Sequence, residues 1–222
     1  MPKPTFLNLS EEKRRRFVDV ALKEFAEYEY RAASLNRIVA GADIAKGSIY
    51  QYFENKKDLY QYLVTYAARE KFRFMALNLR ENPPTLKAFL FDLFTLSRLF
   101  DFQNPALGKL LLNTALEVEN EELNGFLQEF RKLTASFYAE FAQGAAKRRF
   151  IRQDIDISFA SFLLESFDKM ICQYFEVKAD RLYLDFVLDR RLSAEEKLEK
   201  IKSAIDSLVM ALLGALVLNH LY

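Results

Sequence analysis

The stretch from Ala42 to Phe53, ADIAKGSIYQYF, concentrates side chains that can bind nucleic acid. If its second half is a helix, Ile49 and Phe53 lie one turn apart and face inward together with Ile44. The outward face then offers an amine, hydroxyls and an amide, beside a glycine that lets the backbone approach a partner. Gln51 is suited to a base edge. Such a helix fits the major groove of DNA.

The residues before this stretch predict a second helix and a tight turn. Apolar residues recur at helical spacing from Leu35 to Val39, and Ser34 precedes them as an N-cap. Asp43 interrupts the pattern and is a residue type that tolerates a left-handed turn. The following helix is expected to begin near Ala45 or Lys46. The alternative interpretation is an ordinary helical hairpin, because generic helix-turn-helix patterns give false positives.

The run from Ala42 to Phe53, followed by Asn55-Lys56-Lys57-Asp58-Leu59, resembles the DNA-binding signature of TetR-family transcriptional regulators. The resemblance covers Glu11 to Leu59, and the remaining chain is similar to the family only in length and helical pattern. Two residues depart from the family pattern. Asp43 stands where glycine is usual, and Ala45 stands where a serine usually caps the recognition helix. Since a lost cap costs ~1 kcal/mol, Ala45 is not expected to be a side-chain DNA ligand.

The resemblance implies an all-α fold of about nine helices. Residues 1–60 are expected to form an N-terminal three-helix helix-turn-helix DNA-binding domain, and residues 61–222 a C-terminal helical ligand-binding and dimerisation domain. A helix over residues 56–79 would link them, with a phosphate site at its N-terminus. The expected DNA-binding residues are Ser34, Lys46, Gly47, Ser48, Tyr50, Gln51, Tyr52 and Lys56.

The composition favours a packed, mostly helical protein. Of the 222 residues, 51% are hydrophobic, and there are only 6 Gly and 5 Pro. The net charge of +1 is weak evidence for nucleic acid, so the basic residues matter only where they gather near the proposed DNA face. Cys172 and His220 are the single members of their types, which leaves no disulfide framework, catalytic constellation or His/Cys metal cluster. We therefore expect neither enzymatic activity nor a cofactor.

Two segments bear on the cellular location of the protein. Residues 1–10 lack the apolar core of a signal peptide. The apolar run Leu208 to Leu218 is too short for a bilayer, which needs about 20 residues. We expect a cytoplasmic protein with no membrane partner.

Periodicity and capping residues predict the other elements. Ser10 caps a first helix, and Ser193 with Glu196 forms a capping box at the last one. Residues 1–9 are expected to be a loose arm, and 178–192 is undecided, with a short helix as one interpretation. The other predicted helices cover residues 85–102, 105–116, 123–147, 157–177 and 194–219.

The body is rich in aromatic residues, with 21 Phe and 11 Tyr in the chain. The family resemblance implies a small-molecule pocket there, and this composition favours an apolar or aromatic effector, or an acyl chain. A Phe stripe at helical spacing is also what a solid core requires, and that alternative stays open. The candidate pocket residues are Phe89, Leu93, Phe94, Arg98, Asn113, Phe130, Phe137, Tyr138, Phe167 and Gln173.

Two helices, 157–177 and 194–219, carry more apolar surface than one chain covers. A homodimer across a two-fold axis would bury it and pair two DNA-reading units. The alternative is that both helices belong to the core of a monomer. The candidate interface residues are Phe159, Leu163, Ile205, Leu208, Leu212 and Leu216.

These features together predict a dimeric transcriptional repressor that binds a palindromic double-stranded operator and is released by an apolar small molecule. The competing hypothesis is an apolar-ligand carrier or helical interaction module with no DNA role.

Overall fold

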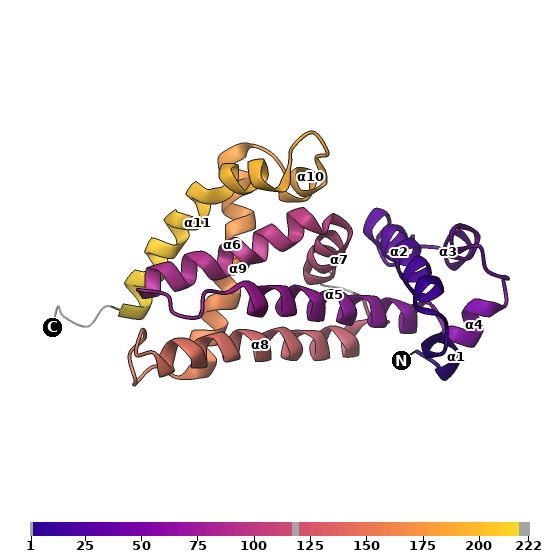
Figure 1. Cartoon of the computed structure of the whole chain (residues 1–222), viewed down its shortest axis with the longest axis horizontal. Helices are drawn as coiled ribbons and strands as arrows, with labels where there is room; N and C mark the ends of the chain where they lie inside the picture. Colours follow the sequence, from indigo (N-terminus) through magenta and orange to yellow (C-terminus); the bar gives the residue numbers. More distant parts are fainter. Residues whose placement is uncertain (1, 117–119, 218–222) are drawn as a thin grey trace. The chain divides into compact units, whose positions relative to one another are not determined.

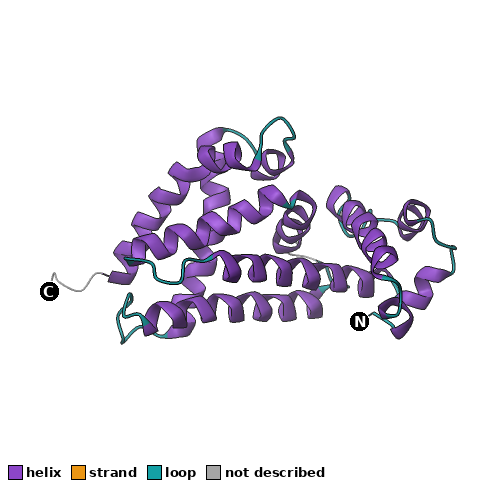
Figure 2. Cartoon of the chain, viewed as in Figure 1, coloured by secondary structure: helices purple, strands orange, loops and turns teal. Residues whose placement is uncertain are grey.

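The computed structural model describes residues 2–116 and 120–217, and no strand occurs in these ranges (Figure 2). The predicted all-α class is confirmed. The described ranges hold eleven helices instead of the roughly nine expected, since both the first residues and the undecided segment contain a short helix. The helices are α1 (Pro4–Leu7), α2 (Glu11–Glu27), α3 (Leu35–Ala42), α4 (Ser48–Tyr52), α5 (Lys56–Asn78), α6 (Leu86–Gln103), α7 (Pro105–Leu116), α8 (Asn124–Lys147), α9 (Ile157–Ala179), α10 (Tyr183–Leu188) and α11 (Ala194–Val217) (Figure 1).

The helix starts follow the capping residues of the sequence. The Asn55 side chain accepts the N–H of Asp58 at 2.9 Å at the start of α5. At α11, Ser193 Oγ accepts the Glu196 N–H at 3.1 Å, while Glu196 Oε2 accepts the Ser193 N–H at 2.8 Å. This is the predicted capping box, and it satisfies two backbone donors at once.

The chain divides into two compact units. Unit 1 comprises Met1–Glu70 and Ala106–Gln128, and unit 2 comprises Lys71–Pro105 and Glu129–Tyr222. Helices α1 to α4, which we call the head, lie entirely in unit 1, whereas α6, α9, α10 and α11 lie in unit 2. The domain boundary expected after residue 60 stays a prediction.

The first residues are not the loose arm expected from the sequence. They contain α1, and its Phe6 is fully buried. The Phe6 ring lies 5.6 Å from that of Phe17, 5.8 Å from Tyr52 and 4.9 Å from Phe53, measured between centroids. Burying one phenyl ring contributes roughly 1.5–3 kcal/mol, which offsets part of the conformational entropy lost when this segment is ordered.

Two tyrosines connect separate segments of unit 1. Thr114 Oγ1 donates to the Leu110 carbonyl at 2.7 Å, so the hydrogen bond of 2.8 Å between Tyr60 and Thr114 has the tyrosine as donor. Tyr30 donates to Glu122 Oε1 at 2.5 Å. Burial, and secondly this bond, raises the pKa of Tyr30. Tyr30 therefore stays protonated, and the two hydrogen bonds join Thr114 and Glu122 to the first segment of unit 1.

The core of unit 2 is built on α6. This helix packs against α10 and α11, and α9 packs against the same two helices. Both Leu93 and Phe94 are fully buried, as their spread around the helix predicts. Helix α11, whose Ile205 and Leu212 are also fully buried, packs against α6.

A group of buried charges lies within unit 2. Arg98, only 2% exposed, contacts Asp168 at 2.8 Å and Asp101 at 3.6 Å. Lys71 lies 2.7 Å from Asp101, and Tyr183 donates to the same carboxylate at 3.4 Å. Burial alone would lower the pKa of Arg98, but the carboxylates hold that pKa well above its usual range. Two cations thus face two anions, and we name these four charged residues the ionic cluster.

Cys172 borders the ionic cluster. Its Sγ accepts a contact from Arg98 Nη1. Burial raises the pKa of this thiol to about 12, so it stays protonated. As the thiolate is the reactive form, Cys172 is an inert buried thiol in this structure.

Candidate nucleic-acid interface

The turn between α3 and α4 is formed by Asp43. Its backbone adopts φ 57° and ψ 50°, the left-handed conformation, and it caps the C-terminus of α3. Aspartate is among the few non-glycine residues that adopt this conformation readily. The departure from glycine at this position therefore leaves the turn intact.

Helix α4 begins later than the sequence predicts. Its first helical residue is Ser48, with Gly47 as N-cap, so Ala45 and Lys46 belong to the turn. No side chain caps the helix. The absence of serine at position 45 therefore removes no cap here, because the cap position is occupied by Gly47.

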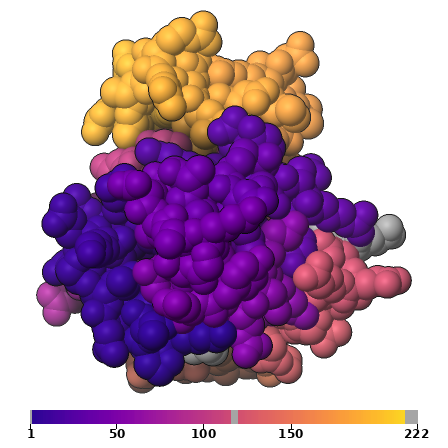
Figure 3. Space-filling view, turned by 90° about the vertical axis from the view of Figure 1, so that its right-hand side faces the viewer, coloured from indigo at the N-terminus to yellow at the C-terminus, as the bar shows by residue number. Residues whose placement is uncertain are grey.

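The side chains of α4 divide as expected between core and surface. Ile49 and Phe53 are buried, and Ile44 is half-buried. Four predicted DNA-binding residues are exposed: Lys46, Gly47, Tyr50 and Gln51, with Tyr50 at 57%. We call these four the recognition face, and Figure 3 shows the surface of the N-terminal residues in indigo to purple.

The other predicted DNA-binding residues are less available. Ser48 is half-buried, and Tyr52 packs its ring 5.8 Å from that of Phe17. Ser34 is the N-cap of α3, but its side chain accepts no capping bond and its backbone N–H donates to Glu24 at 2.7 Å. Lys56 donates to the carbonyls of Arg31 and Ala33 at 3.2 and 3.3 Å. The structure thus gives Tyr52, Ser34 and Lys56 clear internal roles.

Residues of the N-terminal segment hold α4 from its C-terminal side, which the sequence did not reveal. Lys3 donates its backbone N–H to the Tyr52 carbonyl at 2.8 Å and its amine to the Tyr50 carbonyl at 2.9 Å. Thr5 donates its hydroxyl to the Gln51 carbonyl. These bonds satisfy carbonyls that a helix end leaves without partners. Phe6, an aromatic residue two positions after Pro4, was the one signal for this arrangement.

A buried carboxylate fixes α3 against α2. Glu24 of α2 binds Arg37 of α3 at 2.5 Å and also accepts the Ser34 N–H. Arg37 further donates to the Ala32 carbonyl at 2.9 Å and lies 4.1 Å from the Tyr28 ring centroid. These contacts engage the Arg37 guanidinium inside the head.

Gly41 and Gly47 offer a matched pair of substitutions. A Cβ on Gly41 would lie 2.9 Å from Val20 Cγ1, whereas a Cβ on Gly47 would meet nothing within 4 Å. We expect Gly41→Ala to lower the free energy of unfolding by about 1–3 kcal/mol through overpacking. Gly47→Ala should leave it unchanged. Denaturant unfolding followed by circular dichroism measures both, and a fully stable Gly41→Ala protein would contradict the packing of α3 on α2.

The predicted pocket residues lie mostly in packed core. Phe137 stacks on Phe72 with centroids 3.8 Å apart, and Tyr138 is buried near Asp168. Gln173 is exposed on α9, where it cannot line an interior pocket. Of the remaining candidates, Phe89, Leu93, Phe94, Arg98 and Phe130 are buried, and Asn113 and Phe167 are half-buried.

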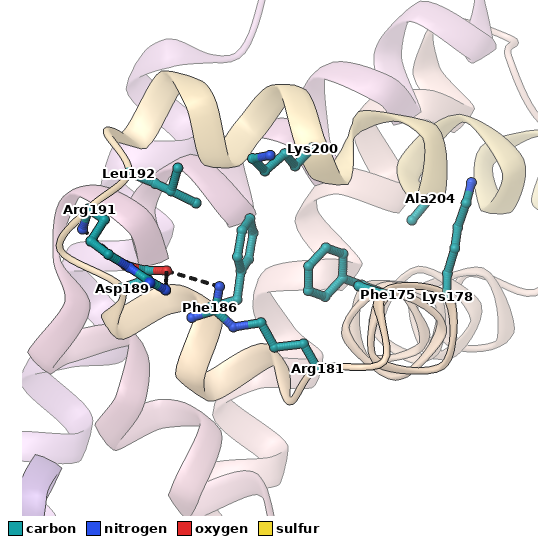
Figure 4. Close-up of a pocket in the computed structure, with 10 residues that line it drawn as sticks. Phe175, Lys178, Arg181, Phe186, Asp189, Arg191, Leu192, Lys200 and Ala204 are labelled. Atoms are coloured by element: carbon teal, nitrogen blue, oxygen red, sulfur yellow. Dashed lines mark hydrogen bonds and ion pairs between the residues drawn. The ribbon is translucent and has the colours of Figure 1, made fainter.

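A cavity of about 500 Å³ lies elsewhere in unit 2, between the end of α9, α10 and the first half of α11 (Figure 4). None of the predicted pocket residues lines it. Its walls combine phenylalanine rings with basic side chains. Sequence reasoning missed it because much of it is formed by the undecided segment 178–192.

The predicted dimer residues differ in how far their side chains are exposed. Ile205 and Leu212 are fully buried within the subunit, so we correct their assignment from interface to core. Leu163 and Leu208 are half-buried. Phe159 is exposed, and the side chain of Leu216 lies outside the described residues.

A stripe of exposed apolar residues runs along α9. Its members recur at spacings that return to one face of a helix. We call them the α9 stripe: Phe159, Phe162, Met170, Tyr174 and Val177, with Phe162 at 61% and Val177 at 83% exposed. Met210 of α11 is also exposed. Exposed apolar surface of this kind marks an interaction site in a folded protein.

Membrane and metal chemistry find no support in the described ranges. None of the helices found there has the length and apolarity that crossing a bilayer requires. In the same ranges, no three His, Cys, Asp or Glu residues gather as metal ligands would.

Comparison with known proteins identifies the head. Residues 17–63 match the family model of bacterial regulatory proteins of the tetR family. An uncharacterized HTH-type transcriptional regulator of Bacillus subtilis (strain 168), YhgD, is 27% identical over 62 residues, which span 28% of this chain and only 32% of that protein.

Solved structures extend the likeness to the whole chain. A TetR family transcriptional regulator from Chloroflexus aurantiacus J-10-FL is 29% identical, with a TM-score of 0.66 and coverage of 95% of this chain and 98% of that one. The transcriptional regulator FadR from Bacillus subtilis, solved in complex with stearoyl-CoA, has a TM-score of 0.65, 18% identity and coverage of 88% and 97%. At that identity it shows the fold alone.

A helix-turn-helix that is followed by an all-helical body defines a bacterial transcriptional regulator. Within that class, residues 17–63 carry the DNA-binding domain of the TetR family, as the resemblance of the sequence predicts, and the whole chain is similar to a TetR family transcriptional regulator.

Proposed function

We propose that this regulator is a repressor that binds a palindromic operator as a homodimer and releases it when an apolar small molecule binds. The recognition face carries this proposal. It places an amine, a phenol and an amide on exposed turns beside a glycine, and no packing requirement explains that glycine. A base-reading amide beside phosphate-binding groups is the combination that major-groove recognition uses.

A dimer follows from the small size of the recognition element. The five residues of α4 extend only about 7.5 Å. One such contact reads few base pairs, whereas dimeric helix-turn-helix proteins read two half-sites about 34 Å apart. The α9 stripe supplies an apolar surface on which a second copy can pack, so we assign the dimer contact to these residues together with Met210.

An effector with an apolar chain is supported by two observations. Unit 2 holds a cavity of about 500 Å³, within the range of roughly 300–1,000 Å³ typical of small-molecule sites. The fold is shared with FadR, whose structure contains stearoyl-CoA. Release requires that the effector bind the DNA-free form more tightly, with a coupling free energy of typically 1–3 kcal/mol.

Substitutions at Gln51 and Lys46 separate sequence reading from phosphate binding. Loss of a base-reading side chain should cost about 1–3 kcal/mol on the operator and relax base preference. We therefore expect Gln51→Ala to bind operator and random DNA more alike. Lys46→Ala should weaken both equally and lower the salt slope by about one. Fluorescence anisotropy with both DNAs across a salt series measures these effects.

Lys56→Ala is not a clean test of phosphate binding, because the Lys56 amine holds two carbonyls of the head. Lys23→Ala, an exposed lysine on α2, serves as a control for charge alone. If Gln51→Ala and Lys46→Ala both bound operator and random DNA like the parent, the recognition face would be wrongly assigned. If the parent protein bound no DNA from its own promoter, this result would favour the competing hypothesis of an apolar-ligand carrier with no DNA role.

A further inference from the structure

The cavity of unit 2 combines an apolar wall with a basic one (Figure 4). Its apolar side holds Phe175 of α9 and Phe186 of α10, whose ring centroids lie 4.5 Å apart, with Leu192 and Ala204. Both phenylalanines are almost fully buried, so this wall is set by the core rather than by mobile surface groups. An alkyl chain or a flat ring can displace water from it.

Four basic residues line the same cavity against a single acid. Arg181 and Arg191 both bind Asp189, at 3.0 and 2.8 Å. These bonds, Arg191 first, hold the pKa of Asp189 below its usual range, so the carboxylate stays ionised and fixes both guanidinium groups. The single negative charge of this carboxylate neutralises the charge of only one of the two arginines.

The two lysines leave further positive charge unbalanced. Lys178 donates to the neutral Ser203 hydroxyl at 2.7 Å. In the described part of the chain, Lys200 has neither a hydrogen bond nor an ion pair, and its side chain lies over the cavity. A chain with a net charge of +1 thus gathers a local positive excess at this one cavity.

We propose that the cavity binds an amphiphilic anion, a molecule with an apolar body and one carboxylate or phosphate group. The body lies against Phe175 and Phe186, and the anionic group is held by Lys200 and the arginines that Asp189 orients. This inference rests on the proposed function: it names the site at which the effector binds and the chemical class of that effector. The binding site itself can be tested without DNA.

Isothermal titration calorimetry with three probes of equal chain length tests the class of ligand. Decanoate and decyl phosphate carry the two possible anionic groups, and decanol has neither. We expect at least one anion to bind and decanol to bind at least tenfold more weakly, because the free energy of one charge-assisted hydrogen bond corresponds to more than a tenfold change in Kd. Affinity for the anion should fall as salt rises. Equal binding of all three probes, or no binding, would overturn the proposal.

Two variants locate the site. Lys200→Gln is expected to weaken the anion about fivefold, the effect of one partly exposed charge. Lys202→Gln is the matched control, because Lys202 lies on the same helix, pairs with Glu199 and does not line the cavity. Ala179→Phe, at an exposed residue of the cavity wall, should reduce binding of every probe by filling the space. Equal effects of Lys200→Gln and Lys202→Gln would place the ligand elsewhere.

Operator release separates the two proposals. If an anion binds with the expected variant profile but leaves operator affinity unchanged, the site stands and ligand-controlled release fails. If no probe binds while another compound releases the operator, the proposed function stands and this site fails.

Discussion

Asp168→Ala is expected to lower the free energy of unfolding by about 3–5 kcal/mol, the cost of leaving a buried charge without its partner. Arg98 has its shortest carboxylate contact with this residue, at 2.8 Å, and is 2% exposed. Asp101 lies farther from Arg98, at 3.6 Å, and its other oxygen binds Lys71 at 2.7 Å, so it compensates for the lost contact only in part. Denaturant unfolding of the full chain measures the loss.

A double variant separates charge burial from packing. Arg98→Met with Asp168→Leu removes both ions and keeps apolar volume, so we expect it to recover most of the stability. Asp154→Ala is the control: Asp154 pairs with Arg152 at the surface, and its loss should change stability little. Asp168→Ala with the stability of the parent would mean that the ionic cluster does not form in solution.

Phe162→Glu is expected to produce a monomer and to abolish operator recognition. Phe162 is a 61% exposed member of the α9 stripe, where an ionised side chain would have to be buried on pairing. A monomer keeps only one half-site, so its operator affinity should fall toward the non-specific level, by roughly 10³-fold or more. Sedimentation velocity and fluorescence anisotropy measure the two effects.

Leu77→Glu is the matched control for this change, because Leu77 is an apolar residue on α5, outside the stripe, that is even more exposed, at 74%. It should leave both the dimer and the operator affinity intact. A Phe162→Glu protein that remained dimeric would show that another surface pairs the subunits. A monomer with full operator affinity would remove the need for a dimer.

The head could be predicted well because its signals are local. Asp43 and Gly47 mark a turn by backbone preference, and Ile49 with Phe53 mark the buried side of α4 by spacing alone. The missed element, α1, is too short for periodicity to register. It is ordered by Phe6, whose ring partners lie far along the sequence.

The body was harder to predict because apolar spacing does not tell which neighbour a face meets. Ile205 and Phe162 have similar apolar character, yet the first is fully buried on α11, which packs against α6 and α9, whereas the second is 61% exposed. The cavity depends on Phe175, Phe186 and Lys200, which come from three helices. These three side chains come together only through tertiary packing, which the sequence pattern of a single helix does not reveal.

The bonds from Lys3 and Thr5 to α4 have a practical consequence for anyone who prepares this protein. A protease that trims the leading residues would remove Phe6 from its ring partners and free three carbonyls of α4, which carries part of the recognition face. Such a clipped sample would still be helical and could still pair through α9, while its operator contacts were loosened. Intact-mass spectrometry should therefore precede any binding titration, and affinity tags belong at the opposite end of the chain.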